Sequence, residues 1–212
     1  SSRISRPPIV PEQSPEYVKS VTAEIIAGRG DDLPVSCFPD DGTYMTGTTQ
    51  FEKRNIAVDI PVWEEKTCIQ CNICAVVCPH AAIRPKVYDK KFIDNAPDSF
   101  KSIDATTKKF AGLAYTLQVA PEDCTGCELC VVACPSEEKD ADGNKTGRKA
   151  INMTPQAPLR ETERANFDYF LNVIPDPNPS ELGFKMENLK GSQFMKPLFE
   201  FSGACSGCGE TP

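Results

Sequence analysis

Eight of the eleven cysteines in this 212-residue chain occur in two copies of one pattern, and this repetition constrains the fold more than any other feature. Each copy has the pattern Cys-x-x-Cys-x-x-Cys-x-x-x-Cys-Pro, one over residues 68–79 and the other over residues 124–135. A disulfide framework needs an even number of more widely spaced cysteines in a short secreted chain. Crowded thiols in an odd total indicate metal ligands in a reducing compartment, which predicts a cytoplasmic protein.

The spacing predicts two [4Fe–4S] clusters that exchange their fourth ligands. The first three thiolates of such a run lie in one tight loop, and the fourth, on the helix that follows, reaches the other cluster. Pro79 and Pro135 turn the chain away after each helix, because proline cannot continue a helix. Electron transfer is the expected role. The first cluster would be bound by Cys68, Cys71, Cys74 and Cys134, and the second by Cys78, Cys124, Cys127 and Cys130.

Zinc is the alternative metal, because it also binds four thiolates. A zinc ribbon pairs one Cys-x-x-Cys with a distant Cys-x-x-Cys, whereas four cysteines here share a single run that ends in proline. The pattern therefore favours iron–sulfur clusters. Their reduction potentials span about −700 to +450 mV depending on the surroundings, so no value follows from the sequence.

The cysteine runs belong to a longer internal repeat. Each half is expected to begin with a short apolar strand, at residues 60–63 and 115–119, and to end with another, at residues 81–83 and 150–153. Strand, cluster loop, short helix and strand thus occur twice. This order predicts an α+β, ferredoxin-like 2[4Fe–4S] domain with a pseudo-two-fold repeat over residues 61–154.

Two polar stretches interrupt the repeat. Residues 84–112 are an insertion rich in lysine and aromatic residues, which we expect to be a packed excursion. Residues 136–149 are expected to form a polar loop whose basic side chains are solvated, although they could also steer an acidic electron acceptor. We expect Trp63 to pack in the core and His80 to lie at the surface or just outside the cluster ligands.

The residues before and after the repeat are expected to form two further regions. Residues 1–60 are expected to form a small linker domain, with a helix over residues 16–27 that Gly28 ends and one strand over residues 51–60. We expect Pro61 to mark the boundary. Residues 155–212 are rich in proline at first and are expected to form an extended connector.

The composition excludes several classes of partner. The chain has 23 basic and 30 acidic residues, a net charge of −7 and a sequence pI of about 4.9. A nucleic-acid or anionic-membrane surface needs clustered lysine and arginine, so we expect neither partner. The longest apolar stretches fall short of the roughly 18 residues of a membrane span, and residues 1–11 lack the apolar core of a secretory leader.

Two further cysteines, Cys205 and Cys208, form an isolated Cys-x-x-Cys flanked by glycines. They are compatible with a redox dithiol, with half of a zinc site or with half of a third cluster. A redox pair usually opens a helix after a strand, whereas Gly209 and Pro212 follow here, so half of a metal site is favoured. Cys37 has no neighbouring cysteine and is expected to be a partly buried structural thiol.

Three stretches together resemble the pyruvate:ferredoxin (flavodoxin) oxidoreductase family. Residues 49–57, Thr-Gln-Phe-Glu-Lys-Arg-Asn-Ile-Ala, resemble the small linking domain known by its Glu-Lys-Arg motif. The two cysteine runs lie where that family carries an inserted ferredoxin-like domain. Residues 203–212, Gly-Ala-Cys-Ser-Gly-Cys-Gly-Glu-Thr-Pro, resemble the opening of the thiamine-diphosphate-binding domain. Many ferredoxins share the cysteine runs, and the flanking motifs in this order make the resemblance specific.

The resemblance implies that the chain is a middle portion of a large homodimeric enzyme. It implies that Cys205 and Cys208 bind a third [4Fe–4S] cluster beside thiamine diphosphate and Mg²⁺, with the other ligands absent here. The parent reaction would convert pyruvate and coenzyme A to acetyl-CoA and CO₂, with the thiamine carrying the chemistry. This chain would pass the electrons through its clusters to ferredoxin or flavodoxin.

Two alternatives remain beside this one. The chain could be a stand-alone ferredoxin-type carrier or electron-transfer subunit without catalysis of its own, or a structural zinc module. The Glu-Lys-Arg stretch and the terminal Cys-x-x-Cys favour the enzyme portion, because a free carrier needs neither.

Overall fold

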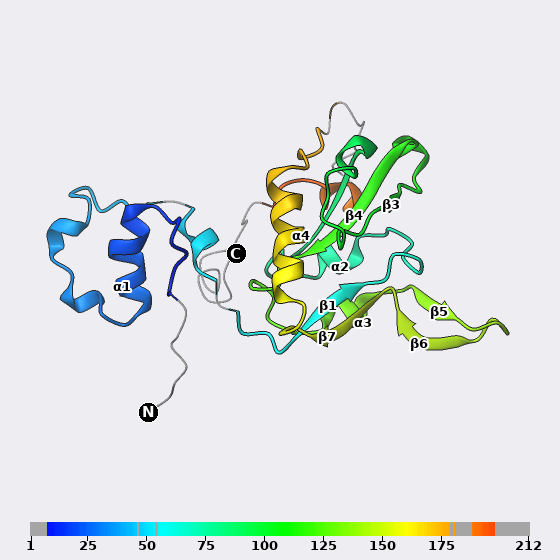
Figure 1. The fold of residues 1–212 in the computed structure, drawn as a ribbon, viewed down its shortest axis with the longest axis horizontal. Coiled ribbons are helices and arrows are strands. Elements are labelled where there is room, and N and C mark those ends of the chain that lie inside the picture. Colours follow the sequence, from blue (N-terminus) through cyan, green and yellow to red (C-terminus); the bar gives the residue numbers. More distant parts are fainter. Residues whose placement is uncertain (1–7, 46, 54, 179, 181–187, 198–212) are drawn as a thin grey trace. The chain divides into compact units, whose positions relative to one another are not determined.

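The computed structural model of the chain describes residues 8–45, 47–53, 55–178, 180 and 188–197 (Figure 1). Two compact units divide between Arg54 and Asn55, and each is described by itself. Within the described ranges, no helix combines the length and the apolar character that a bilayer crossing requires.

The first unit contains the helix that the apolar spacing predicted. A π-helical segment, Val18–Thr22 (η1), continues as an α-helix, Ala23–Ile26 (α1). Gly28 follows in the left-handed conformation (φ +75°), and the N–H of Arg29 donates to the carbonyl of Glu24 at 2.9 Å. This bond pattern closes the helix end and requires a residue without a Cβ, which confirms Gly28 as its stop.

The rest of this unit is made of short 3₁₀ turns around a small apolar core. The turns are Gly30–Asp32 (η2), Val35–Cys37 (η3) and Thr48–Phe51 (η4). The core residues are Val10, Val18 and Ala23, with Phe51 packed against them.

The single strand predicted over residues 51–60 is wrong. Turn η4 occupies its start, Asn55 has a positive φ of 51°, and Val58 is 81% exposed. Strand β1 begins only at Asp59, where a neighbouring strand offers hydrogen-bond partners. Pro61 lies inside that strand, opposite Met153, rather than at a boundary.

The second unit contains three of the four strands predicted for the repeat near their expected positions. The fourth, expected at residues 81–83, instead runs over residues 83–89, because Ala81 has a positive φ of 49°. Strand β1 (Asp59–Trp63) pairs antiparallel with β7 (Ile151–Pro155), and β2 (Ile83–Asp89) pairs antiparallel with β4 (Leu113–Val119). Each pair therefore joins the opening strand of one half to the closing strand of the other. A short strand, β3 (Ile103–Asp104), adds to the free edge of β4.

The β2–β4 sheet is buried on both faces because its side chains alternate between two cores. Odd-numbered residues such as Val87 and Tyr115 join the core that contains cysteines of both runs. Even-numbered residues such as Tyr88 and Ala114 join a second core with helix α4 (Arg160–Asn172). Figure 1 shows α4 lying beside this sheet.

Helix α4 contradicts the extended connector predicted after Thr154. The prolines that suggested extended chain flank the helix and do not interrupt it, since none lies between Pro158 and Pro175. Aromatic residues at helical spacing then bury one side of the helix against the sheet. These residues are Phe167, Tyr169 and Phe170, which pack together with Ile174.

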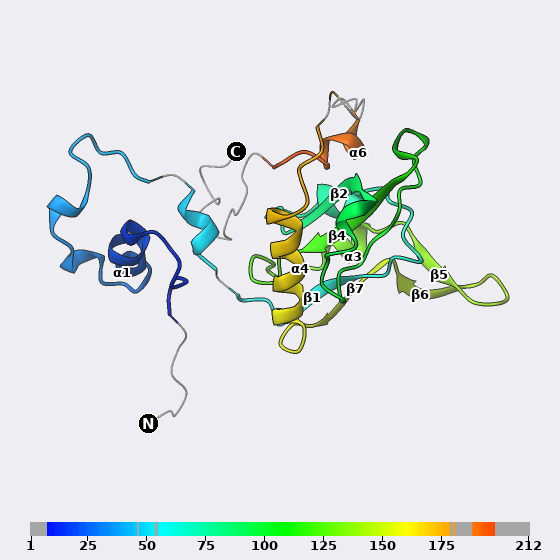
Figure 2. The same cartoon turned by 45° about the horizontal axis from the view of Figure 1, so that its top comes forward.

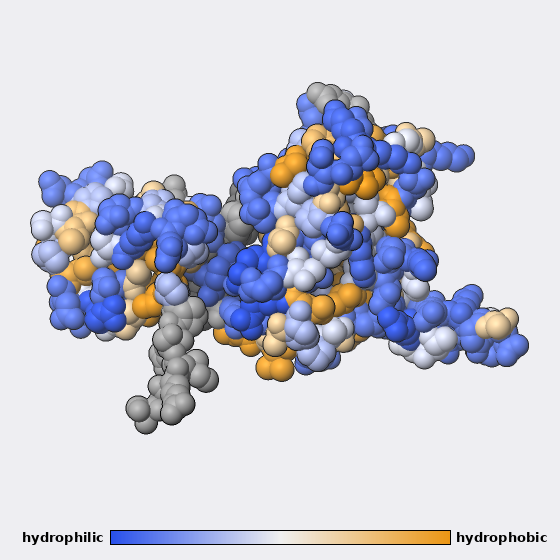
Figure 3. Space-filling model, viewed as in Figure 1, coloured by the Kyte–Doolittle hydropathy of each residue, from blue (hydrophilic) through white to orange (hydrophobic). Residues whose placement is uncertain are grey.

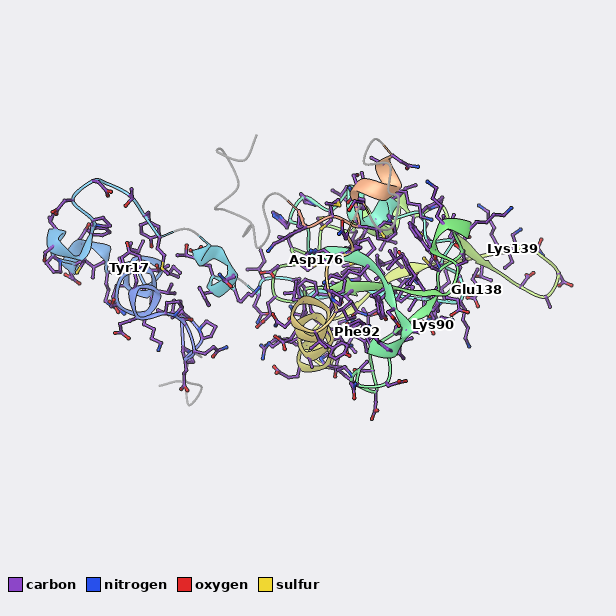
Figure 4. All side chains as sticks on the ribbon, turned by 90° about the horizontal axis from the view of Figure 1, so that it is seen from above. Tyr17, Lys90, Phe92, Glu138, Lys139 and Asp176 are labelled. Atoms are coloured by element: carbon purple, nitrogen blue, oxygen red, sulfur yellow. The ribbon has the colours of Figure 1, made fainter. Side chains whose placement is uncertain are left out.

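The predicted polar loop at residues 136–149 is a β-hairpin. Strand β5 (Glu137–Lys139) pairs antiparallel with β6 (Lys145–Lys149). At the turn the carboxylate of Asp140 accepts hydrogen bonds from the backbone N–H groups of Asp142 (3.0 Å) and Asn144 (2.8 Å). The hairpin projects from the second unit (Figure 2), its surface is hydrophilic almost throughout (Figure 3), and it carries Glu138 and Lys139 (Figure 4).

The insertion at residues 84–112 is a packed excursion, as predicted. It completes β2 and then forms two 3₁₀ turns, Lys90–Phe92 (η5) and Lys108–Phe110 (η6). The side chains of Phe100 and Phe110 are buried. A further short helix, Leu189–Ser192 (α6), lies within the residues predicted as the connector.

Candidate metal centre

The two cysteine loops adopt the same backbone conformation at equivalent positions. Gln70 and Asn72 are left-handed in the first loop (φ 56° and 64°), and Gly126 and Glu128 are left-handed in the second (φ 71° and 63°). Asn72 caps helix α2 (Ile73–Val76), and Glu128 caps helix α3 (Leu129–Ala133). Repeated left-handed residues curl each loop, so that its cysteine side chains turn toward one side.

Each loop also aims a backbone N–H at its first cysteine. The N–H of Gln70 donates to Sγ of Cys68 at 3.3 Å, and the N–H of Gly126 donates to Sγ of Cys124 at 3.4 Å. A donor at this distance favours the thiolate over the thiol. Both loops thus stabilise negative charge on the sulfur.

Gly126 and Gln70 occupy equivalent left-handed positions in the two loops, but their surroundings differ. A Cβ at Gly126 would lie 3.2 Å from the carbonyl oxygen of Asp59, so a side chain there would press on the backbone of β1. Gln70 is buried, and its side-chain amide donates to the carbonyl of Asp104 and accepts from the N–H of Thr106. This role of Gln70 could not be predicted, because a glutamine in the left-handed conformation has no recognisable pattern in a sequence.

The cysteines of the two runs line two separate cavities. The first, cavity one, encloses about 330 Å³ of space, part of it open to solvent, and its wall includes Trp63, Tyr115 and Ile151. Its cysteines are Cys68, Cys71, Cys74 and Cys134. Three therefore come from the first run, and the fourth comes from the end of the second run.

The second, cavity two, has the reciprocal composition. It encloses about 340 Å³, again partly open to solvent, and its wall includes Pro61, His80, Ile83 and Met153. Its cysteines are Cys78, Cys124, Cys127 and Cys130. Cys127 is exposed and Cys130 is buried, so this cavity has an outer and an inner end.

Burial dominates the electrostatics of the inner thiols. It raises the pKa of Cys74 well above the ordinary range, and the neighbouring Cys68, Cys71 and Cys134 raise it further. Burial likewise raises the pKa of Cys130 to about 12; Cys124, Cys78 and Cys127 add to the rise, and a hydrogen bond from the Val131 backbone opposes it. Four thiolates so close together need a cationic centre among them.

The donor set and the walls fit a [4Fe–4S] cluster. Four soft thiolates suit iron–sulfur chemistry, and apolar side chains form much of each wall. Each wall also has a buried ring nitrogen, Nε1 of Trp63 in cavity one and Nδ1 of His80 in cavity two, that finds no hydrogen-bond partner among the described residues. In those same residues, no three Cys, His, Asp or Glu converge on a single-ion site.

The other predicted residues lie in the core, in the first unit and on the hairpin. Trp63 is 3% exposed and belongs to the core, as predicted. Cys37 is half-buried in the first unit. On the hairpin, Lys145 pairs with Glu137, and Arg148 pairs with Glu64. Cys205 and Cys208 lie outside the described residues.

Two family profiles match the chain. Residues 67–137 match the 4Fe-4S dicluster domain, which accounts for both cysteine runs and identifies an iron–sulfur domain. Residues 3–57 match a family named EKR, described as a domain of unknown function.

Curated relatives match the chain over nearly its whole length. A pyruvate-flavodoxin oxidoreductase of Nostoc sp. is 53% identical over 94% of this chain and 16% of the relative. A probable pyruvate-flavodoxin oxidoreductase of Escherichia coli is 50% identical over 98% of the chain and 17% of the relative. A pyruvate:ferredoxin oxidoreductase of Moorella thermoacetica is 45% identical over 94% of the chain and 16% of the relative.

The chain thus spans about one sixth of the length of these relatives. The match includes both cysteine runs and the Glu-Lys-Arg stretch. By sequence, the chain corresponds over nearly its whole length to one section of pyruvate-flavodoxin and pyruvate:ferredoxin oxidoreductases.

Proposed function

We propose that this chain is the electron-transfer section of a pyruvate:ferredoxin (flavodoxin) oxidoreductase. Two [4Fe–4S] clusters would carry electrons from the thiamine-dependent oxidative decarboxylation of pyruvate, which yields acetyl-CoA and CO₂, to ferredoxin or flavodoxin. One observation carries the proposal: each cavity is lined by three cysteines of one run and one of the other.

The residues of each cavity have distinct tasks in this proposal. The four thiolates hold the cluster, which supplies one-electron redox chemistry when bound. The apolar walls restrict water, and the N–H groups of Gln70 and Gly126 stabilise charge on Cys68 and Cys124. The cysteines are Cys68, Cys71, Cys74 and Cys134 in cavity one and Cys78, Cys124, Cys127 and Cys130 in cavity two.

Helix α3 connects the two cavities. Cys130 in the helix lines cavity two, and Cys134 directly after it lines cavity one. Four residues of α-helix rise only about 6 Å. Electrons would therefore cross between the clusters within about one helical turn of protein.

The domain order, the third cluster and the oligomeric state in this proposal rest on the similarity to the relatives. The second unit would be a ferredoxin-like domain with a pseudo-two-fold repeat, which is supported by the equivalent left-handed residues and the reciprocal strand pairs. We propose the domain order linker, dicluster domain and connector, with the first boundary at residues 54–55, where the two units divide, rather than at residue 61. Cys205 and Cys208 would contribute to a third cluster beside thiamine diphosphate and Mg²⁺, in a cytoplasmic homodimer.

A stand-alone carrier without catalysis of its own is the second candidate. The Glu-Lys-Arg region argues against it, because the relatives share this region with the chain inside much longer proteins. A carrier would need the dicluster domain alone.

The test uses the protein that carries this sequence, purified without oxygen. We expect pyruvate and coenzyme A to bleach its visible iron–sulfur absorbance, and flavodoxin to restore it. Cys71→Ala and Cys127→Ala should each abolish flavodoxin reduction, whereas Cys37→Ala, a cysteine outside both cavities, should not. Bound zinc in place of iron, or full flavodoxin reduction by both cavity variants, would overturn the proposal.

A further inference from the structure

The single tryptophan of the chain lines cavity one, and its ring nitrogen makes no hydrogen bond to the described residues. Trp63 is 3% exposed, and its buried Nε1 has no hydrogen-bond partner among the described residues. Buried N–H donors are rarely left unpaired in native proteins, and one that borders a cavity suggests a partner inside it.

The surrounding structure fixes the orientation of this ring. Trp63 ends strand β1 opposite Ile151, and its backbone carbonyl accepts a hydrogen bond from Nζ of Lys101. The ring meets Tyr115 edge to face, with centroids 5.8 Å apart and an interplanar angle of 67°. Because the ring is held on several sides, its N–H has a defined direction.

The indole N–H lies beside the sulfur of Cys68. It interacts with that sulfur without reaching the geometry of a regular hydrogen bond, and no other described residue accepts from it. The N–H therefore stays available for another acceptor in the same cavity.

We infer that the indole N–H of Trp63 donates a hydrogen bond to a sulfur of the cluster in cavity one and makes that cluster easier to reduce. This inference rests on the proposed function. Reduction places more negative charge on the sulfurs, so an N–H donor stabilises the reduced state more than the oxidised state and raises the potential.

The internal repeat provides a comparison within the molecule. Trp63 lies five residues before Cys68, and Val119 occupies the equivalent place before Cys124. Valine has no side-chain donor, so this position distinguishes the two cavities. Nδ1 of His80 in cavity two also lacks a hydrogen-bond partner among the described residues. An imidazole nitrogen can either donate or accept a hydrogen bond, whereas an indole nitrogen can only donate, so the two cavities still differ in their side-chain donors.

The first experiment measures reduction potentials of the iron-loaded chain by film voltammetry. Trp63→Phe keeps an aromatic ring against Tyr115 and removes the donor together with part of the indole ring. We expect one of two one-electron waves to move to a lower potential by about 30–60 mV, a three- to tenfold change in the ratio of oxidised to reduced cluster. The other wave should stay in place.

The matched control is Tyr115→Phe. This change also removes a donor from the wall of cavity one, but the Tyr115 hydroxyl already donates to Oδ1 of Asn72 at 2.9 Å. A comparable shift of the same wave in Tyr115→Phe would overturn the inference. Two intact clusters with no shift in Trp63→Phe would also overturn it, and would leave the proposed function standing.

A second experiment needs no variant. Because Trp63 is the only tryptophan, labelling with indole-¹⁵N tryptophan marks one nitrogen in the chain. We expect pulsed EPR of the reduced clusters to show a ¹⁵N coupling to one of them. Absence of this coupling in a chain with both clusters would refute the inference, whereas a chain that binds no iron would refute the proposed function.

Discussion

The ammonium group of Lys86 lies 2.9 Å from a carboxylate oxygen of Asp176, and both residues meet at the end of helix α4. Nζ of Lys86 also donates to the carbonyls of Phe170 (2.8 Å) and Ile174 (2.6 Å), and it lies 4.5 Å from the centroid of the Phe170 ring. Figure 4 marks Asp176 in this region. A cation at the carboxyl end of a helix is favourable for the helix dipole, so one side chain of β2 anchors α4 to the sheet.

Lys86→Met should destabilise the second unit by about 1–3 kcal/mol, because it leaves two helix-end carbonyls without their buried donor. Denaturant unfolding followed by circular dichroism measures the change. Lys90→Met is the matched control, since Lys90 pairs with Asp104 on the surface and exposed pairs contribute at most about 1 kcal/mol. Equal losses in both variants would contradict this role of Lys86.

Paired alanine variants should distinguish crossed from uncrossed cluster ligands. Cys68→Ala with Cys134→Ala removes two ligands of cavity one, so we expect about four of roughly eight iron atoms to remain. Cys68→Ala with Cys78→Ala removes one ligand from each cavity, and we expect loss of most of the iron. Iron and sulfide analysis of the two double variants measures this difference. More iron in the Cys68/Cys78 variant than in the Cys68/Cys134 variant would refute the crossed assignment.

Gly126→Ala should weaken cluster retention in cavity two. Its φ of +71° costs an alanine about 1–2 kcal/mol, and the new Cβ would press on the carbonyl of Asp59. Iron release to a chelator should become faster. Gly147→Ala has a similar backbone (φ +83°) with nothing within 4 Å, in the hairpin, and should release iron at the wild-type rate.

Glu163 should give the stability of the second unit a pH dependence. Burial raises its pKa, although a hydrogen bond with Asn166 and the charge of Lys101 oppose the rise. The folded state therefore favours the protonated carboxyl, and the free energy of unfolding should fall as pH rises from the ordinary carboxyl pKa to the raised value.

Glu163→Gln should remove this part of the pH dependence, and the measurement is the difference in unfolding free energy between wild type and variant from about pH 4 to 8. Glu161→Gln, on the exposed part of the same helix, is the control. If the difference in unfolding free energy between wild type and Glu163→Gln stayed constant across the pH range, the raised pKa of Glu163 would be contradicted.

Much of the second unit could be predicted because its signals are local. The cysteine spacing grouped Cys78 with the second run, and those residues line one cavity. Three strands of the repeat have short apolar runs, whereas β2 continues through Arg84, Pro85 and Lys86, so the sequence indicated only its first residue. Side-chain roles across the fold were not predictable, such as Gln70, which reaches the backbone of Asp104 and Thr106 from a cysteine loop.

The incorrect predictions have specific physical causes. Residues 51–60 have the composition of a strand, but a strand also needs a neighbour, and the first residue paired with a neighbouring strand is Asp59. The prolines around α4 suggested extended chain, although Pro158 and Pro175 only bound the helix. In both cases tertiary contacts, which local composition does not report, decide the structure.

The pairing of Asp59 with Pro155 has a consequence for how this domain could be built into other proteins. The chain enters the repeat at one end of β1 and leaves it at the adjacent end of β7, roughly one strand spacing of 5 Å away. A host protein would need to open only a single surface loop to accept residues 59–155, provided that it also supplied a cover for the sheet face on which α4 packs. Such a geometry allows the whole dicluster unit to be gained, lost or exchanged as a cassette.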